Sequence, residues 1–98
     1  MPDTEASVAV PTVEVLLPRA LVELFPGAPR RLELAAPTVT AMIDELDMRW
    51  PGMGDRLRDS TPRIRRHLNI FVAGRRASLE TQLEPGIQVY ILTAMSGG

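Results

Sequence analysis

The chain has 98 residues, a length that allows one domain with one hydrophobic core. Its 45% apolar residues, 23% charged residues and net charge of −1 are ordinary for a soluble globular protein and give no general attraction to nucleic acid or acidic membrane. Cysteine is absent and His67 is the single histidine, which excludes disulfides, thiolate or histidine-rich metal sites and a cysteine nucleophile. No apolar run reaches the length of a membrane span. The N-terminal segment also differs from a secretory signal, because Asp3 and Glu5 precede any basic residue. We therefore expect a cytoplasmic protein.

The first third of the chain predicts two strands. Within residues 8–17, apolar side chains recur at every second position from Val13 to Leu17, which is typical of a strand with one buried face. The segment 19–30 is rich in turn signals. Residues 31–35 follow as a second strand, which we expect to pair antiparallel with the first.

Residues 38–50 predict the one long helix. Thr38 is a suitable N-cap, and a hydroxyl cap stabilises a helix by ~1 kcal/mol. Five apolar side chains then follow at helical spacing and form one stripe: Val39, Met42, Ile43, Leu46 and Trp50. Pro51-Gly52 ends the helix, and we expect Trp50 to be largely buried at this end.

The second half of the chain predicts a loop and then three strands. Residues 52–62 read as a loop or a short irregular helix. Residues 68–72 form a strand that closes on the turn Ala73-Gly74, and residues 75–79 can return as a short edge strand. Residues 87–92 are the last strand.

These elements predict one α+β domain over residues 1–98, with a flexible C-terminal tail over residues 94–98. A single helix with one apolar stripe must be covered by the face of one sheet. We therefore expect a mixed sheet of four to five strands wrapped on one main helix, which is the ubiquitin-like β-grasp.

The tail is the most informative stretch of the sequence. After the apolar strand residues Tyr90-Ile91-Leu92, the chain becomes small and polar and ends on Gly97-Gly98. Glycines pack poorly and lose the most conformational entropy on folding, but they can enter a narrow slot in another protein because no side chain projects. A Gly-Gly ending therefore predicts either a reactive α-carboxylate at Gly98 or merely a frayed terminus or cloning remnant.

Three local patterns carry a resemblance to a known family. Pro37-Thr38-Val39 opens the helix and Arg49-Trp50-Pro51-Gly52 ends it. Leu68-Asn69-Ile70-Phe71-Val72-Ala73-Gly74 gives a central strand and turn, and the stretch from Leu83 to Gly98 gives the last loop, strand and tail. On these marks the chain from Val13 to Gly98 resembles the MoaD/ThiS family of ubiquitin-like sulfur carriers. The region Arg66-His67-Leu68-Asn69-Ile70 is most similar to the carriers that serve cysteine biosynthesis. Two positions depart from the family pattern: Ala73, where Asn or Asp is commoner, and Met95.

The resemblance implies a mechanism in which this chain is a co-substrate with no catalytic residue, metal or bound cofactor of its own. A ubiquitin-activating-type adenylyltransferase would use ATP and magnesium to adenylate the Gly98 carboxylate, and sulfur would convert it to a thiocarboxylate. That group would donate sulfur to a sulfur-accepting biosynthetic enzyme, for cysteine, molybdopterin, thiazole or another sulfur-containing metabolite. Ala94, Met95, Ser96 and Gly97 would form the tail that reaches the active site.

Strand alternation also predicts a docking surface. If the helix-facing positions of the last strands are apolar, Phe71, Tyr90 and Leu92 face outward and form an exposed apolar patch at the base of the tail. The alternative is that loops or the N-terminal segment cover these side chains.

A basic cluster is left without an assignment. Five arginines belong to it: Arg63, Arg65, Arg66, Arg75 and Arg76. The cluster can bind an acidic partner or a phosphate, or it can be a charged surface that contacts only solvent. Nucleic-acid binding would require a net basic domain with interleaved aromatic residues. His67 borders a strand with no second histidine or nucleophile beside it, as is usual for a surface histidine.

Two other classes of function stay open. One is a ubiquitin-like protein modifier conjugated through Gly98 to lysines of other proteins. The other is a non-reactive β-grasp interaction subunit, against which the Gly97-Gly98 ending argues.

Overall fold

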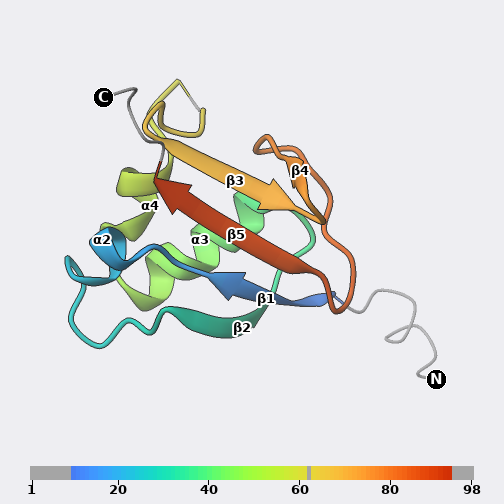
Figure 1. Cartoon of the computed structure of the whole chain (residues 1–98), viewed down its shortest axis with the longest axis horizontal. Helices are drawn as coiled ribbons and strands as arrows, with labels where there is room; N and C mark the ends of the chain where they lie inside the picture. The colour runs from blue at the N-terminus through green and yellow to red at the C-terminus, as the bar shows by residue number, and fades with distance from the viewer. Residues whose placement is uncertain (1–9, 62, 94–98) are drawn as a thin grey trace.

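The computed structural model describes residues 10–61 and 63–93, which form one mixed sheet packed on helices (Figure 1). The strands are β1 (Thr12–Leu16), β2 (Arg31–Ala35), β3 (Leu68–Val72), β4 (Arg75–Arg76) and β5 (Gln88–Thr93). The helices are α2 (Arg19–Val22), α3 (Val39–Arg49) and α4 (Met53–Leu57). This arrangement is the expected α+β, ubiquitin-like β-grasp, with α3 as the main helix.

The sheet has the strand order β2-β1-β5-β3-β4, so the first and last strands of the chain lie side by side at its centre. β1 and β5 are parallel, whereas β1 pairs antiparallel with β2, and β3 pairs antiparallel with both β5 and β4. The predicted hairpin of the first two strands is therefore confirmed. β1 pairs with residues 88–90 of β5 and β3 pairs with residues 89–93, so the far end of β5 is held by β3 alone.

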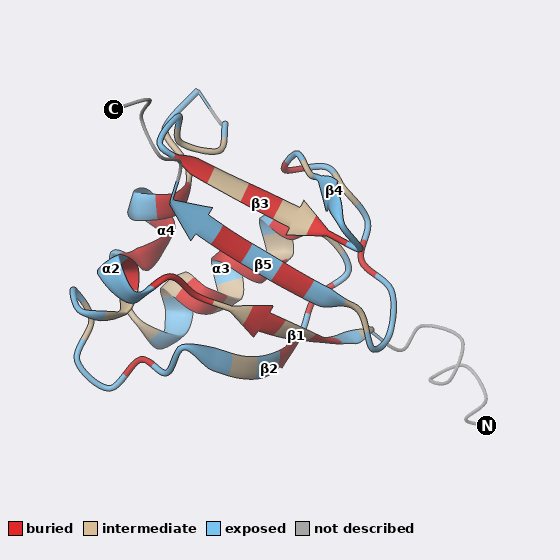
Figure 2. Cartoon of the chain, in the orientation of Figure 1, coloured by how far each residue is buried: buried red, intermediate tan, exposed pale blue. Residues whose placement is uncertain are grey.

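The hydrophobic core lies between the inner face of the sheet and α3. Buried and outward positions alternate along β1, β3 and β5, as Figure 2 shows by colour. Nine of the fully buried side chains come from these strands and from the helix stripe: Val13, Val15, Val39, Met42, Ile43, Leu46, Ile70, Val89 and Ile91. Each such side chain contributes roughly 1.5–3 kcal/mol by leaving water, so this layer is the main source of stability.

The free backbone N–H groups at the N-terminus of α3 find hydrogen-bond acceptors in two places, the Thr38 side chain and the chain around residues 79–81. Thr38 is the N-cap, as predicted, and its Oγ1 accepts a hydrogen bond from the Ala41 backbone N–H at 3.1 Å. The carbonyl of Leu79 accepts from the Thr40 N–H at 3.0 Å and from its hydroxyl at 2.8 Å, and the carbonyl of Thr81 accepts from the Val39 N–H at 3.0 Å. The chain around residues 79–81 thus supplies partners for N–H groups that a helix cannot satisfy itself.

This cap explains why β4 is shorter than the predicted strand over residues 75–79. β4 covers only Arg75–Arg76, and Ala77 adds one hydrogen bond from its N–H to the Ile70 carbonyl at 2.7 Å. The chain then leaves the sheet to reach the start of α3. The prediction of strand up to Leu79 is therefore wrong by three residues, because capping the helix competes with extending the sheet.

Other boundaries differ in smaller ways. β1 begins at Thr12 and not at residue 8. Val10 is 48% exposed, and Pro11 has no N–H to donate to a neighbouring strand. Residues 8 and 9 lie outside the described part of the chain. Residues 52–62 contain α4, which confirms the alternative of a short helix there. Trp50 packs against the core at the end of α3 and leaves only a minor part of its surface exposed, in line with the expectation.

The turn between β3 and β4 is built on two residues with positive φ. Ala73 has φ 53° and Gly74 has φ 81°, both in the left-handed region. Glycine adopts this region freely, but an alanine there is strained by its Cβ. The departure from Asn or Asp at this position therefore has a conformational cost.

Candidate functional site

The outward face of the sheet carries one row of residues that crosses all five strands. The pairing registers place Arg31 opposite Leu16, Leu16 beside Tyr90, Tyr90 opposite Phe71 and Phe71 opposite Arg76. Three apolar or aromatic side chains thus occupy the middle of the row, and an arginine stands at each end. The residues come from distant parts of the sequence, and only the sheet order brings them together.

The predicted apolar patch lies on this face. Tyr90 is 38% exposed and Leu92 is 45% exposed, whereas Phe71 is half-buried. Leu92 lies opposite Asn69 in the ladder, one step nearer to the end of β5. Leu16, also half-buried, extends the row onto β1 and was missed from the sequence because an alternating pattern does not say which strand will be the neighbour. The role of these side chains in partner binding stays a prediction.

A polar network lies beside the patch on the same face. Gln88 Nε2 donates to Glu14 Oε1 at 2.7 Å, and the Tyr90 hydroxyl donates to Gln88 Oε1 at 3.3 Å. Arg31 Nε lies 3.3 Å from Glu14 Oε2. These exposed contacts contribute little to stability, but they orient the Tyr90 side chain along β5.

The tail begins where this face ends. Thr93, the last residue of β5, lies opposite Leu68 at the start of β3. The predicted tail residues Ala94, Met95, Ser96 and Gly97, and the predicted reactive Gly98, lie outside the described residues. The described residues therefore fix the position of the strand that leads into the tail and of the patch beside it.

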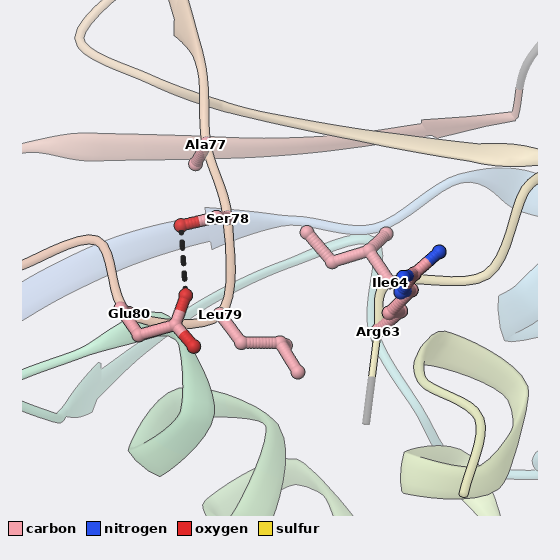
Figure 3. Close-up of a pocket in the computed structure, with 6 residues that line it drawn as sticks. All are labelled: Arg63, Ile64, Ala77, Ser78, Leu79 and Glu80. Carbon is pink, nitrogen blue, oxygen red and sulfur yellow. Dashed lines mark hydrogen bonds between the residues drawn. The ribbon is translucent and has the colours of Figure 1, made fainter. Parts of the chain in front are cut away.

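One pocket of the described residues has no lining residue from β5. It has a volume of about 390 Å³ and is lined by Arg63, Ile64, Ala77, Ser78, Leu79 and Glu80 (Figure 3). The Ser78 hydroxyl donates to Glu80 Oε1 at 3.2 Å, and the Ser78 N–H donates to Thr81 Oγ1 at 2.9 Å. These are contacts of a local turn, and the lining offers no imidazole that would activate the hydroxyl.

The titratable groups that the structure describes do not converge on a metal or acid–base site. No group of three or more His, Asp or Glu side chains within residues 10–61 and 63–93 could hold a metal ion. His67 is exposed and lines two shallow hollows beside Arg56. In the same part of the chain no helix has the length and apolar character needed to cross a membrane.

The fold is shared with solved structures of small proteins. Neither the protein-family models nor the curated proteins include a match to this chain. Among solved structures, the complex of BexX and CysO from Amycolatopsis orientalis contains a chain that is 28% identical, with a TM-score of 0.77 over 88% of this chain and 99% of that one. CysO from Mycobacterium tuberculosis is 27% identical, with a TM-score of 0.76 over 85% of this chain and 99% of its own. In fold the chain is similar to the MoaD/ThiS-like β-grasp proteins.

A more distant structure has the same fold as this chain. SAMP1 from Haloferax volcanii is 22% identical, with a TM-score of 0.72 over 89% of this chain and 99% of SAMP1. Together these similarities support a sulfur-carrier or ubiquitin-like role, the role implied by the sequence resemblance.

Proposed function

We propose that this chain is a cytoplasmic sulfur carrier whose reactive group is the α-carboxylate of Gly98. The observation that carries the proposal is the position of β5. This strand lies at the centre of the sheet, presents Tyr90 and Leu92 to solvent, and leads directly into the sequence Ala94-Met95-Ser96-Gly97-Gly98. In this proposal β5 joins the docking surface to the reactive tail.

The chemistry follows from the poor reactivity of a carboxylate, whose negative charge repels nucleophiles. An oxygen of the Gly98 carboxylate attacks the α-phosphorus of ATP, and pyrophosphate leaves. A sulfur nucleophile then attacks the acyl carbon, and AMP leaves with the electron pair of the broken C–O bond. With hydrosulfide as the nucleophile, Gly98 then holds a thiocarboxylate. Its sulfur displaces a leaving group on the acceptor, and hydrolysis of the resulting acyl–sulfur bond leaves the sulfur on the acceptor and restores the Gly98 carboxylate. A partner enzyme supplies the magnesium and the catalytic groups for both activation steps.

This chain supplies docking and reach. Residues 94–98, fully extended, span about 17 Å, since a chain extends by up to ~3.4 Å per residue. That distance is sufficient to cross from a docked surface into a buried active site. A CysO has been crystallised with BexX, which supports a protein partner for the present chain. An adenylyltransferase and a sulfur-accepting biosynthetic enzyme are the two partners that the mechanism requires.

The proposal is tested by ATP–pyrophosphate exchange with a candidate activating enzyme. Exchange should depend on the full chain and should stop when Gly98 is deleted or when one residue is added after it. Replacing Gly97 by valine should slow exchange, because a β-branched side chain must then enter the slot and the backbone loses freedom. The loss of exchange should occur without any change in the folded spectrum. Exchange that continues after Gly98 is deleted would contradict the proposal.

A second candidate is a protein modifier joined through Gly98 to lysines of other proteins. The similarity in fold to SAMP1, whose full name is small archaeal modifier protein 1, favours keeping it. The present chain contains no lysine, so it offers no ε-amine as an acceptor of its own. Extracts in which the activating enzyme works should contain reductant-resistant adducts of this chain if it is a modifier, and only the free chain if it is a carrier alone.

A further inference from the structure

The charge of this chain is concentrated in one segment. Residues 56–76 contain seven arginines and one aspartate, a formal charge of +6, whereas the whole chain carries −1. The remaining residues therefore carry −7. The near-neutral total charge therefore hides an uneven distribution of charge along the sequence, and a basic region can orient an approaching acidic partner where the fold gathers it on one surface.

The fold gathers part of this charge at one edge of the sheet. Arg65, Arg66 and Arg76 line a hollow of about 230 Å³ together with Asn69, over a floor of apolar side chains. β4 pairs only with the last two residues of β3, so the edge of β3 from Leu68 to Ile70 borders this hollow. The hollow is therefore open beside the strand that pairs with the end of β5.

Arg66 and Arg76 form no ion pair with the described part of the chain, and Arg65 lies near the Asp59 carboxylate without an ion-pair contact to it. The ion pairs within residues 10–61 and 63–93 engage Arg31, Arg49 and Arg58 instead. Arg65 is held in place because its Nε donates to the Asp55 carbonyl at 2.6 Å, a contact with a neutral group. Among the residues that the structure describes, no acidic side chain lines the hollow. A guanidinium in this position can form a bidentate contact with a carboxylate from outside.

The hollow also adjoins the apolar row. Arg76 lies directly opposite Phe71, which in turn lies opposite Tyr90. A partner that covers Tyr90 and Phe71 must therefore meet Arg76 at the next strand. Apolar anchors with a charged rim are the usual composition of a specific protein interface, in which the charges set partner choice and association rate.

We propose that this arginine-lined edge binds an acidic segment of the protein that receives the tail. The inference rests on the proposed function, because it assigns the recognition of the same partner. A nucleic acid is the poorer fit, since the rest of the chain is strongly acidic and none of the described lining residues is aromatic and able to stack on a base. The docking surface thus has two parts, an apolar row for affinity and an arginine edge for orientation.

The surface is first tested without any partner enzyme. A decapeptide of alternating glutamate and glycine, titrated into the full chain, should shift the amide NMR signals around Arg65, Arg66 and Arg76. The variant Arg66→Gln/Arg76→Gln should weaken this binding by about tenfold, whereas Arg19→Gln/Arg49→Gln, which removes the same charge elsewhere, should not. Shifts spread evenly over the surface, equal effects of the two variants, or tighter binding of a short RNA or DNA oligonucleotide at the same salt would overturn the proposal.

The second arm uses the activating enzyme. The Arg66→Gln/Arg76→Gln variant should raise the KM for the chain by roughly tenfold at low salt, with kcat nearly unchanged, and the salt dependence of KM should diminish. A KM within twofold of wild type, with the same salt dependence, would overturn the proposal while leaving the sulfur-carrier function intact. If instead the wild-type chain itself supports no exchange, the proposed function fails, and the peptide titration still decides the arginine edge.

Discussion

Phe71 on β3 and Tyr90 on β5 lie directly opposite each other in the antiparallel ladder, on the face of the sheet turned away from α3. Tyr90 is also the parallel neighbour of Leu16 on β1. Three strands that are far apart in sequence therefore contribute to one apolar row. This row lies at the strand that leads into the tail, which makes it the natural docking surface for an enzyme that acts on Gly98.

Charge in this row should weaken partner binding. Phe71→Asp or Leu92→Asp should raise the Kd for the activating enzyme by roughly thirtyfold, about 2 kcal/mol, because a carboxylate would be desolvated in an apolar interface. Met48→Asp is the matched control, since Met48 is 75% exposed and lies on α3, on the other side of the molecule. Isothermal titration gives the Kd, and circular dichroism shows that each variant folds. An unchanged Kd for both sheet variants would remove the patch from the account.

The N-cap of α3 should contribute measurably to stability. Thr38→Ala removes the hydrogen bond from the Ala41 N–H and should lower the free energy of unfolding by ~1 kcal/mol. Thr38→Ser keeps the hydroxyl and should lose much less. Urea denaturation of the three proteins measures the difference, and equal losses in both variants would show that packing of the Thr38 methyl group, not capping, is responsible.

The turn after β3 offers a stabilising substitution. Ala73 has φ 53°, a conformation that asparagine and glycine tolerate better than alanine. Ala73→Asn should therefore raise the free energy of unfolding by roughly 0.5–1 kcal/mol. Ala35→Asn, at an exposed position of β2 outside any turn, should not be stabilising. A melting temperature of the Ala73 variant at or below that of wild type would contradict the strain inferred at this residue.

The loop between α4 and β3 should respond to acid. Hydrogen bonds to the Asp59 carboxylate, first from the Thr61 side chain and then from the Thr61 and Arg63 backbone N–H groups, lower the pKa of Asp59 below 3.8. A lowered folded-state pKa means that the stabilisation is complete above the unfolded value and is lost as pH falls through the folded pKa. Thr61→Val should raise the pKa of Asp59 in an NMR titration. The free energy of unfolding of the Thr61→Val variant should be lower than that of wild type at neutral pH, and this difference should shrink as pH falls and the Asp59 carboxylate protonates. A difference that does not change with pH would exclude this mechanism.

The sequence was sufficient to predict the elements and the fold, because helix stripe, strand alternation and turn residues all agree. Thr38 as N-cap and the outward positions of Tyr90 and Leu92 follow from local periodicity alone. Leu16, the Glu14–Gln88 contact and the arginine hollow depend on which strands become neighbours, and no local pattern specifies that β5 lies beside β1. β4 ends early because the carbonyls of Leu79 and Thr81 accept hydrogen bonds from the first turn of α3. These contacts join residues about 40 positions apart, so a local sequence pattern cannot predict them.

The central claim is that Gly98 carries sulfur, and mass analysis of the C-terminus tests it most directly. The full chain is incubated with its activating enzyme, ATP, magnesium and a sulfur source, and its mass is measured before and after alkylation with iodoacetamide. Alkylation is needed because oxidation of Met95 would add nearly the same mass to the same C-terminal peptide. The account predicts one oxygen replaced by sulfur, a carboxamidomethyl adduct on Gly98, and neither change in a chain that lacks Gly98. A sulfur-containing product that persists after Gly98 is deleted, or no such product from a chain that supports ATP–pyrophosphate exchange, would contradict it.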